Sequence, residues 1–316
     1  MDQLAIADRR MLRRKLTFWR VAAALLLIAI GFSVYRFAAG GGESVLPHVA
    51  RVEISGMITD DDELVERLEK IAKNSQAKAL VVSISSPGGT TYGGERIFKA
   101  LRAVAAEKPV VSDIRTLAAS AGYMIASAGD NIVAGESSIT GSIGVIFQYP
   151  QVQPLLEKLG VSLEEIKSAP LKAEPSPFHP ASDDAKAMIR AMVMDSYDWF
   201  VDLVADRRGM TRDEVLKLAD GTIFTGRQAL KVKLVDQLGG TPEIRKYLAS
   251  RGVDEKLPIV DWKKAENSSF LSLASAAGIA GLMGLDVNTV SETLRGWSGG
   301  KLFLDGLVSV WQVGQQ

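Results

Sequence analysis

The feature that most constrains this chain is an alternation of short apolar runs with longer helical stretches, which starts at Val49. Residues 79–84 are almost continuously apolar, as expected of a strand covered on both faces of a sheet. This run ends in Ser85-Ser86-Pro87-Gly88-Gly89, and a stretch with helical spacing follows. Strands separated by helices are the signature of a βα-type sheet fold, so we predict an α/β architecture.

The same pattern gives the expected elements. It predicts strands at 49–58, 79–84, 109–114, 132–134 and about 143–147. It predicts helices after an Asp60–62 cap, through 97–104, from about 118, and at 183–208, 213–218 and 226–230, with a helix and a strand between 154 and 166. The 183–208 helix carries an apolar stripe of Met188, Met192, Met194, Trp199 and Val201, which suits either the core or a subunit interface.

An uncharged segment, 21–35, lies between Arg20 and Arg36. Fifteen helical residues cover only about 22 Å of a hydrocarbon core of roughly 30 Å, but interfacial aromatic residues and outward-reaching arginines extend the span. Six basic side chains against two acidic ones in the first 20 residues favour a cytoplasmic N-terminus. We expect a single-pass transmembrane anchor at 18–37. A cleaved signal peptide, suggested by Ala38-Ala39-Gly40, and a buried soluble helix are the alternatives.

These patterns divide the chain into five parts. We expect a basic cytoplasmic arm at 1–17, the anchor at 18–37, a Gly-rich linker at 38–47 and a main domain at 48–262 outside the cytoplasm. The tail, 263–316, is rich in Ala and Gly and ends in an apolar run. Ser and Gly interrupt the apolar residues in the first part of the tail, and the final apolar run is too short to cross a membrane. We therefore expect the tail to contact a neighbouring subunit or the membrane surface.

Composition narrows the chemistry. The chain has no cysteine, which excludes thiolate nucleophiles, disulfides and cysteine-ligated metal sites. It has only two histidines, His48 and His179, so few residues could supply the histidine of a Ser-His-Asp triad. The formal net charge of +0 argues against a nucleic-acid partner. Hydrolysis would have to rely on serine, lysine, carboxylates and backbone amides.

Two glycine-containing turns follow predicted strands, at Pro87-Gly88-Gly89 and Ala119-Ser120-Ala121-Gly122. Strand ends are the usual ligand site of an open α/β sheet, and free amides there can stabilise an oxyanion. Ser120 therefore has the position of a nucleophile, although a helix start of such small residues more often serves close packing than catalysis. A neutral lysine can serve as its base, and Lys167 and Lys172 are candidates because they follow a predicted strand.

Five ordered motifs resemble the signal peptide peptidase A family, also called protease IV, over about 49–247. They are the segments at 82–89, 116–123, 140–145, 167–172, and 220–229 with 234–236. The resemblance implies the crotonase-like or Clp-protease-like α/β spiral, a bacterial serine peptidase held in the inner membrane, and a Ser–Lys dyad. It also implies no metal or organic cofactor, signal peptides and other apolar peptides as substrates, and a ring-shaped homo-oligomer, an octamer being one such assembly.

Carried over by motif position, Ser120 is the nucleophile and Lys172 the general base, with Lys167 as the second candidate. Ser142 matches a hydroxyl that orients the lysine, and the amides of Gly89 and Ala121 would form the oxyanion hole. The chain departs from the family at Ala121 and Ala169, where glycine is common.

Two other functions remain compatible with such a fold. One is a crotonase-type enzyme acting on acyl-CoA thioesters, and the other is an inactive member that serves as a membrane scaffold. Neither requires Ser120 and Lys172 together.

Overall fold

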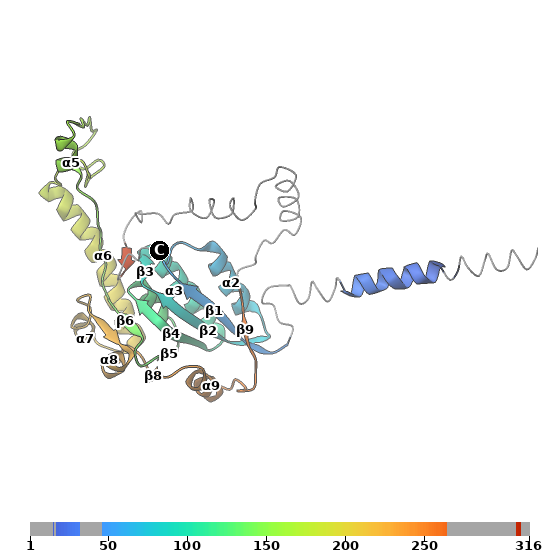
Figure 1. The fold of residues 1–316 in the computed structure, drawn as a ribbon. Coiled ribbons are helices and arrows are strands. Elements are labelled where there is room, and N and C mark those ends of the chain that lie inside the picture. Colours follow the sequence, from blue (N-terminus) through green and yellow to red (C-terminus); the bar gives the residue numbers. More distant parts are fainter. Residues whose placement is uncertain (1–14, 16, 32–45, 264–307, 311–316) are drawn as a thin grey trace, which may run out of the picture. The chain divides into compact units, whose positions relative to one another are not determined.

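The computed structural model describes residues 15, 17–31, 46–263 and 308–310 (Figure 1). The chain divides into two units, 1–43 and 44–316, and each is described by itself. In the first unit, residues 17–31 form a helix. Across the described ranges, no helix combines the length and the apolar character needed to cross a membrane. Residues 32–37 of the predicted anchor and most of the predicted linker lie outside the described residues.

The second unit is built on an eight-stranded sheet with the order β7-β6-β4-β2-β1-β9; outside this path, β5 pairs with β4, and β8 pairs with β5. Its long central strands are β1 (His48–Ser55), β2 (Ala77–Ser86) and β4 (Val110–Ala119), and they run parallel. The shorter strands are β5 (Asn131–Ala134), β6 (Ile139–Gly141), β7 (Ile223–Thr225), β8 (Gln237–Leu238) and β9 (Ile259–Asp261). Of the pairs in this sheet, only β6 with β7 is antiparallel, so the sheet is largely parallel, and the predicted α/β architecture is confirmed.

Helices cover both faces of the sheet. The helices are α2 (Asp62–Lys73), α3 (Thr91–Glu107), α4 (Ala121–Ala126), α5 (Gln153–Lys158), α6 (Asp183–Arg208), α7 (Arg212–Leu216), α8 (Gly226–Lys231) and α9 (Thr241–Ser250). Leu80 and Val82 pack in one core with side chains of α2, α3, α4 and α6, whereas Ala79 and Val81 pack with Ile244 of α9. Because successive strand residues point to opposite faces, both sets must be apolar, which explains why residues 79–84 are almost continuously apolar.

β4 carries two partners along one edge. Its first half, Val111 to Ile114, pairs with β5, and its last residues, Leu117 to Ala119, pair with β6. The sheet therefore divides near the carboxyl end of β4. The helix expected from about residue 118 begins only at Ala121, because Ala118 and Ala119 remain in the β6 ladder.

Two expected strands are wrong. Residues 143–147 form no strand, since Gly141 and Ser142 have φ values of 90° and 52° and turn the chain out of the β6 ladder. Residues 159–166 are also irregular, and Ile166 is fully exposed, so no neighbouring strand is there to pair with them. Lys167 and Lys172 consequently do not follow a strand.

An arm made of α5 and the first half of α6 projects from the body of the unit (Figure 1). α6 spans the 26 residues expected, capped by the Ser182 hydroxyl and by Gly209 at φ 59°. Its second half buries Phe200, Val201 and Val204 in the core. The predicted apolar stripe is therefore divided, because Met192 and Met194 on the first half are exposed.

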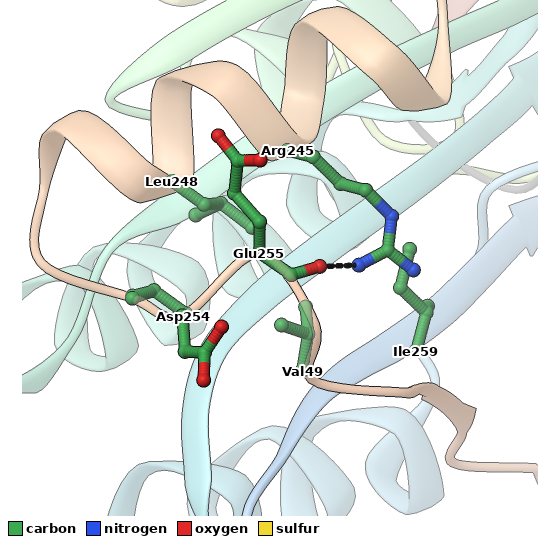
Figure 2. A pocket seen from close by; sticks show the side chains of 7 residues that line it. Val49, Arg245, Leu248, Asp254, Glu255 and Ile259 are labelled. Atoms are coloured by element: carbon green, nitrogen blue, oxygen red, sulfur yellow. Dashed lines mark hydrogen bonds between the residues drawn. The ribbon is translucent and has the colours of Figure 1, made fainter.

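A shallow depression lies between α9 and the start of β1 (Figure 2). Arg245 crosses it and donates hydrogen bonds to the carbonyls of Glu255 and Leu257, and Leu248 and Val253 fill its floor. Val49 marks the amino end of β1, and Ser120 follows the carboxyl end of the parallel β4. The depression is therefore filled by side chains, and it lies at the amino ends of the parallel strands, opposite the edge that carries Ser120.

Candidate active site

Ser120 stands between β4 and α4 in a strained conformation. Its φ and ψ are 57° and −121°, a region that L-residues rarely adopt, and the residue is only 1% exposed. The strain is held in place because the Ser120 N–H donates a 2.9 Å hydrogen bond to the Gly141 carbonyl of β6. A serine fixed in a sharp strand-to-helix turn is the arrangement that presents a nucleophilic hydroxyl.

Ala121 begins α4 directly after this serine and is fully buried. The next residue, Gly122, packs on β2, where an added Cβ would lie 2.8 Å from the Ser86 carbonyl oxygen. This contact holds the first turn of α4 against the end of β2. The predicted amide donor, Ala121 N, therefore sits on a rigid support beside Ser120.

Gly89, the other predicted oxyanion donor, lies in β3 (Gly88–Thr90), next to the end of β2. Ile58 donates to the Gly88 carbonyl at 2.9 Å, and Thr90 donates to the Ile58 carbonyl at 2.8 Å. A Cβ on Gly89 would lie 1.8 Å from the Ile58 oxygen, so only glycine fits here. Since neighbouring residues of a strand direct their backbone groups to alternate edges, the Gly89 N–H faces away from Ile58.

The edge of β3 that faces away from Ile58 pairs with β10 (Val308–Val310), which runs antiparallel to β3. Ser309 is opposite Gly89, Val308 opposite Thr90, and Val310 opposite Gly88. A segment near the C-terminus therefore meets the strand that carries the predicted oxyanion donor. The sequence-based expectation for the tail did not include this contact with its own chain, and the rest of 264–316 lies outside the described residues.

Ser142 is the neighbour of Gly141 and lies across from Ser120 at the end of β6. Ala119 pairs with Gly141, so the residues that follow them, Ser120 and Ser142, leave the ladder side by side. Ser142 also has a positive φ, 52°, is 8% exposed, and donates its N–H to the Thr222 carbonyl at 2.8 Å. Two strained serines thus emerge together where the sheet divides.

Lys172 lies elsewhere in this chain. It belongs to the exposed loop that precedes α6, on the arm, and its backbone N–H closes a turn to the Ala169 carbonyl at 3.0 Å. The first half of α6, about 13 residues or roughly 20 Å at helical rise, separates the start of the helix from its core-packed half. The structure therefore brings Ser120, Ala121, Gly89 and Ser142 together but leaves Lys172 on the arm.

Lys167, the second candidate base, is held by carboxylates. Its Nζ lies 2.6 Å from Glu165 Oε2 and 2.6 Å from Glu174 Oε1. These hydrogen bonds, first that to Glu165, raise the pKa of the Lys167 ammonium, and they lower the pKa of both carboxyl groups. A lysine that keeps its proton is a poor general base, so the local chemistry favours Lys172 over Lys167. No local sequence pattern had pointed to Glu165 or Glu174.

The two histidines have structural partners. His48 is fully buried, with Nδ1 at 2.8 Å from the Leu46 carbonyl and Nε2 accepting from the Trp262 indole at 3.0 Å. This assigns the proton to Nδ1 and leaves neither nitrogen for catalysis. His179 lies on the arm, 3.3 Å from Lys167 Nζ.

A strained serine beside glycine-supported amides at the carboxyl end of a parallel sheet defines the class of a serine hydrolase. Comparison with known proteins gives the family. The model of peptidase family S49 matches residues 102–253, and that of Clp protease matches 44–137.

This chain aligns with most of the length of three relatives. A candidate protease of Synechocystis sp. is 37% identical over 64% of this chain and 73% of its own. A candidate protease of Methanocaldococcus jannaschii is 33% identical over 68% and 69%. A protein of Enterococcus faecium named as a candidate signal peptide peptidase is 32% identical over 78% and 75%. The chain belongs to peptidase family S49, and it is a serine peptidase with a Clp-protease-like α/β domain.

Proposed function

We propose that this peptidase degrades cleaved signal peptides and other apolar peptides, with Ser120 as the nucleophile and Lys172 as the general base. The observation that carries the proposal is the strained turn that fixes Ser120 between β4 and α4. The substrate class is supported by the relatives named as signal peptide peptidase and, from Haemophilus influenzae, as Protease 4.

In the proposed mechanism, the neutral amine of Lys172 removes the Ser120 proton as Oγ attacks the peptide carbonyl. The amides of Gly89 and Ala121 stabilise the negative charge on the carbonyl oxygen, and the Ser142 hydroxyl orients the lysine. The lysine ammonium then protonates the leaving amine, the C–N bond breaks, and an acyl-enzyme forms. Water then attacks this ester and gives a proton to the lysine. The lysine ammonium returns a proton to Ser120 Oγ as the ester C–O bond breaks, which releases the carboxylic acid product and regenerates the neutral lysine.

The position of Lys172 on the arm supports a dyad formed between copies of the chain in a homo-oligomeric ring. The arm exposes large apolar side chains that a neighbouring subunit would cover, among them Leu159, Ile166 and Met192. Enclosure between subunits would also remove water from the lysine, which favours the neutral amine that a base requires.

Mixing inactive variants tests both the dyad and the assembly. Ser120→Ala and Lys172→Ala should each lower cleavage of a fluorogenic apolar peptide by about 10³-fold or more. When the two variants are unfolded and refolded together, random assembly should restore about a quarter of the sites, since those pair an intact serine with a neighbour's intact lysine. No recovery would place the dyad within one chain, and full activity of Lys172→Ala would overturn the assignment of the base.

The same assay separates the alternatives. Thioester hydrolysis or hydration without peptide cleavage would indicate the crotonase-type enzyme. A wild type inactive on both substrate classes, with an intact assembly, would indicate the scaffold.

We further propose that 18–37 anchors the chain in the bacterial inner membrane, with residues 1–17 in the cytoplasm and the peptidase domain outside it. The support is the basic first segment and the uncharged stretch that follows it. Because the chain has no cysteine, single cysteines can report topology. A membrane-impermeant maleimide should label Ser162→Cys in cells with a permeabilised outer membrane, and Gln3→Cys only after lysis. The reverse pattern would contradict this orientation.

A further inference from the structure

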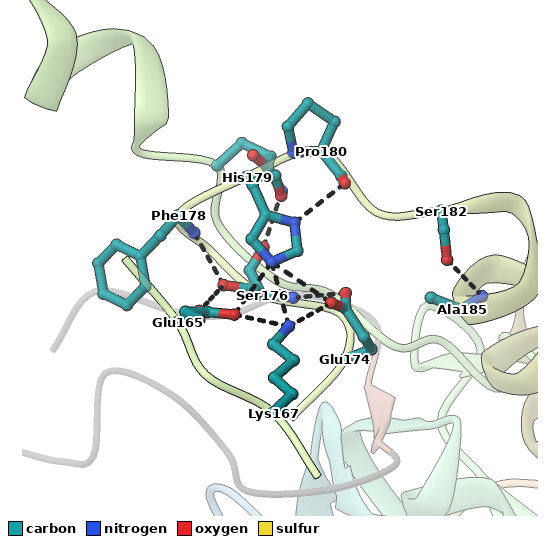
Figure 3. A network of polar contacts seen from close by, with 10 residues as sticks. Glu165, Lys167, Glu174, Ser176, Phe178, His179, Pro180, Ser182 and Ala185 are labelled. Carbon is teal, nitrogen blue, oxygen red and sulfur yellow. Dashed lines mark hydrogen bonds and ion pairs between the residues drawn. The ribbon is translucent and has the colours of Figure 1, made fainter. Parts of the chain in front are cut away.

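Four ionisable side chains gather at the outer end of the arm, just before α6 (Figure 3). Lys167 lies between Glu165 and Glu174 at 2.6 Å from each. The His179 Nε2 is within 3.4 Å of both carboxylates and 3.3 Å from Lys167 Nζ. Glu174 is the most enclosed member, with its side chain 5% exposed.

The ion pair between Lys167 and Glu174 closes the loop that carries Lys172. The two residues are the ends of an eight-residue segment, and Lys172 stands two positions before Glu174. Inside the loop, the N–H groups of Lys172 and Glu174 donate to the carbonyls of Ala169 and Leu171 at 3.0 Å and 3.3 Å. The main chain at Lys172 is thus held by one ion pair across the loop and two turn hydrogen bonds within it.

This closed loop is also fastened to the arm. Ser176 donates its N–H to Glu174 Oε2 at 3.3 Å and its hydroxyl to Glu165 Oε1 at 3.3 Å. Gln151 donates its amide to the carbonyls of Ser176 and His179 at 3.0 Å each. The carboxylates therefore hold together two separate parts of the segment, 165–167 and 174–179, and Gln151 links the second part to the chain just before α5.

We infer that Lys167 and Glu174 are positioning residues, whose ion pair fixes the loop that presents the general base Lys172. The inference rests on the proposed dyad. A lysine side chain has four rotatable carbons, so its amine reaches a defined place only if the backbone that carries it is fixed. Misplacement of a catalytic group by about 1 Å can cost up to roughly 100-fold in rate, so such a clamp affects catalysis whatever the ion pair adds to the stability of the fold.

The test compares substitutions at Lys167, Glu174 and Lys172 in the full chain, with kcat and KM measured on an apolar peptide. Lys167→Met and Glu174→Gln should each lower kcat by about 10- to 100-fold and leave KM nearly unchanged. Lys167→Arg, which restores two ion pairs but has no usable neutral form, should recover most of that loss. Lys158→Met, the same change at an exposed lysine of α5, is the matched control for general effects on the arm.

Each other outcome has a distinct meaning. If Lys167→Met keeps the wild-type kcat while Lys172→Met is inactive, the dyad stands and the positioning role is overturned. If Lys167→Arg is as inactive as Lys167→Met while Lys172→Met is active, Lys167 is the base and the proposed function fails at that residue. If Lys167→Met lowers kcat but Lys158→Met lowers it equally, the effect belongs to the arm as a whole and the clamp is overturned.

Discussion

Ser120 and Ser142 leave two paired strands side by side, each with a positive φ, 57° and 52°. The ladder between Ala119 and Gly141 imposes this arrangement, because both chains must turn sharply at the same level of the sheet. Two non-glycine residues in this conformation cost of order 1–3 kcal/mol each. Strain at this place is consistent with a site in which both hydroxyls are needed.

Two substitutions at Ser142 should separate the effect of its backbone strain on stability from the effect of its hydroxyl on catalysis. Ser142→Gly relieves the backbone strain and Ser142→Ala retains it, but both remove the hydroxyl. We expect both variants to lose about 10- to 100-fold in kcat, with the glycine variant more stable than the alanine variant by about 1 kcal/mol. Peptide kinetics and urea unfolding measure the two effects. An active Ser142→Gly variant would show that the hydroxyl has no role.

Gly89→Ala should disturb both the fold and the site. The new methyl group would lie 1.8 Å from the Ile58 carbonyl oxygen, so β3 would have to move away from Ile58 and carry the Gly89 amide with it. We expect a loss of peptidase activity greater than the loss of stability explains, as judged from the remaining folded fraction. Gly240→Ala, where an added Cβ meets no atom within 4 Å, is the control. Equal kinetics for Gly89→Ala and wild type would contradict the oxyanion assignment.

Ser309→Pro should increase activity. Ser309 is opposite Gly89 in the antiparallel pair of β10 with β3, and proline cannot donate to that ladder. Because β10 takes the edge of β3 to which the Gly89 N–H points, weakening this pair should free the amide for a substrate carbonyl. The expected signature is a lower KM for short apolar peptides, and Ser309→Ala, which keeps the backbone N–H, should resemble the wild type. An unchanged KM in the proline variant would mean that β10 does not compete with substrate.

Trp262→Phe should lower stability and spare catalysis. The indole N–H of Trp262 donates to the buried His48 Nε2 at 3.0 Å, and the phenylalanine variant leaves that nitrogen without its donor. An unsatisfied buried polar group costs about 1–3 kcal/mol. Denaturant unfolding should show this loss, while kcat and KM of the folded fraction should not change. A specific loss of kcat would make His48 a catalytic candidate.

Asp113→Asn should raise the melting temperature at neutral pH. The carboxyl group lies in β4 with its side chain 8% exposed, and burial raises its pKa above the ordinary 3.8 although Arg115 lies 3.3 Å away. An acid with a higher pKa in the folded state binds its proton more tightly there, so its ionised form opposes folding above that pKa. We expect a gain of about 2–4 °C. The gain should disappear as the pH is lowered toward 3.8, and a gain that is independent of pH would exclude this cause.

Local sequence determined much of this protein. Near-continuous apolar strands with helices between them predicted an α/β sheet fold, and the absence of cysteine with only two histidines directed attention to serine and lysine. The helical pattern predicted the bounds of α6 at 183–208, and in the structure the Ser182 hydroxyl and Gly209 cap its two ends. Such signals are readable because they depend on side-chain periodicity and on capping groups that act within a few residues.

Tertiary structure decided what depends on distant partners. A strand exists only where another edge accepts its backbone, so 159–166 remains irregular on the projecting arm, whereas the three residues of β10 find the edge of β3. The strain at Ser120 depends on Gly141, the role of His48 on Trp262, and the protonation of Lys167 on Glu165 and Glu174. Residue types reveal which groups can react, but hydrogen-bond geometry and charge at close range select which of them keeps, gives or accepts a proton.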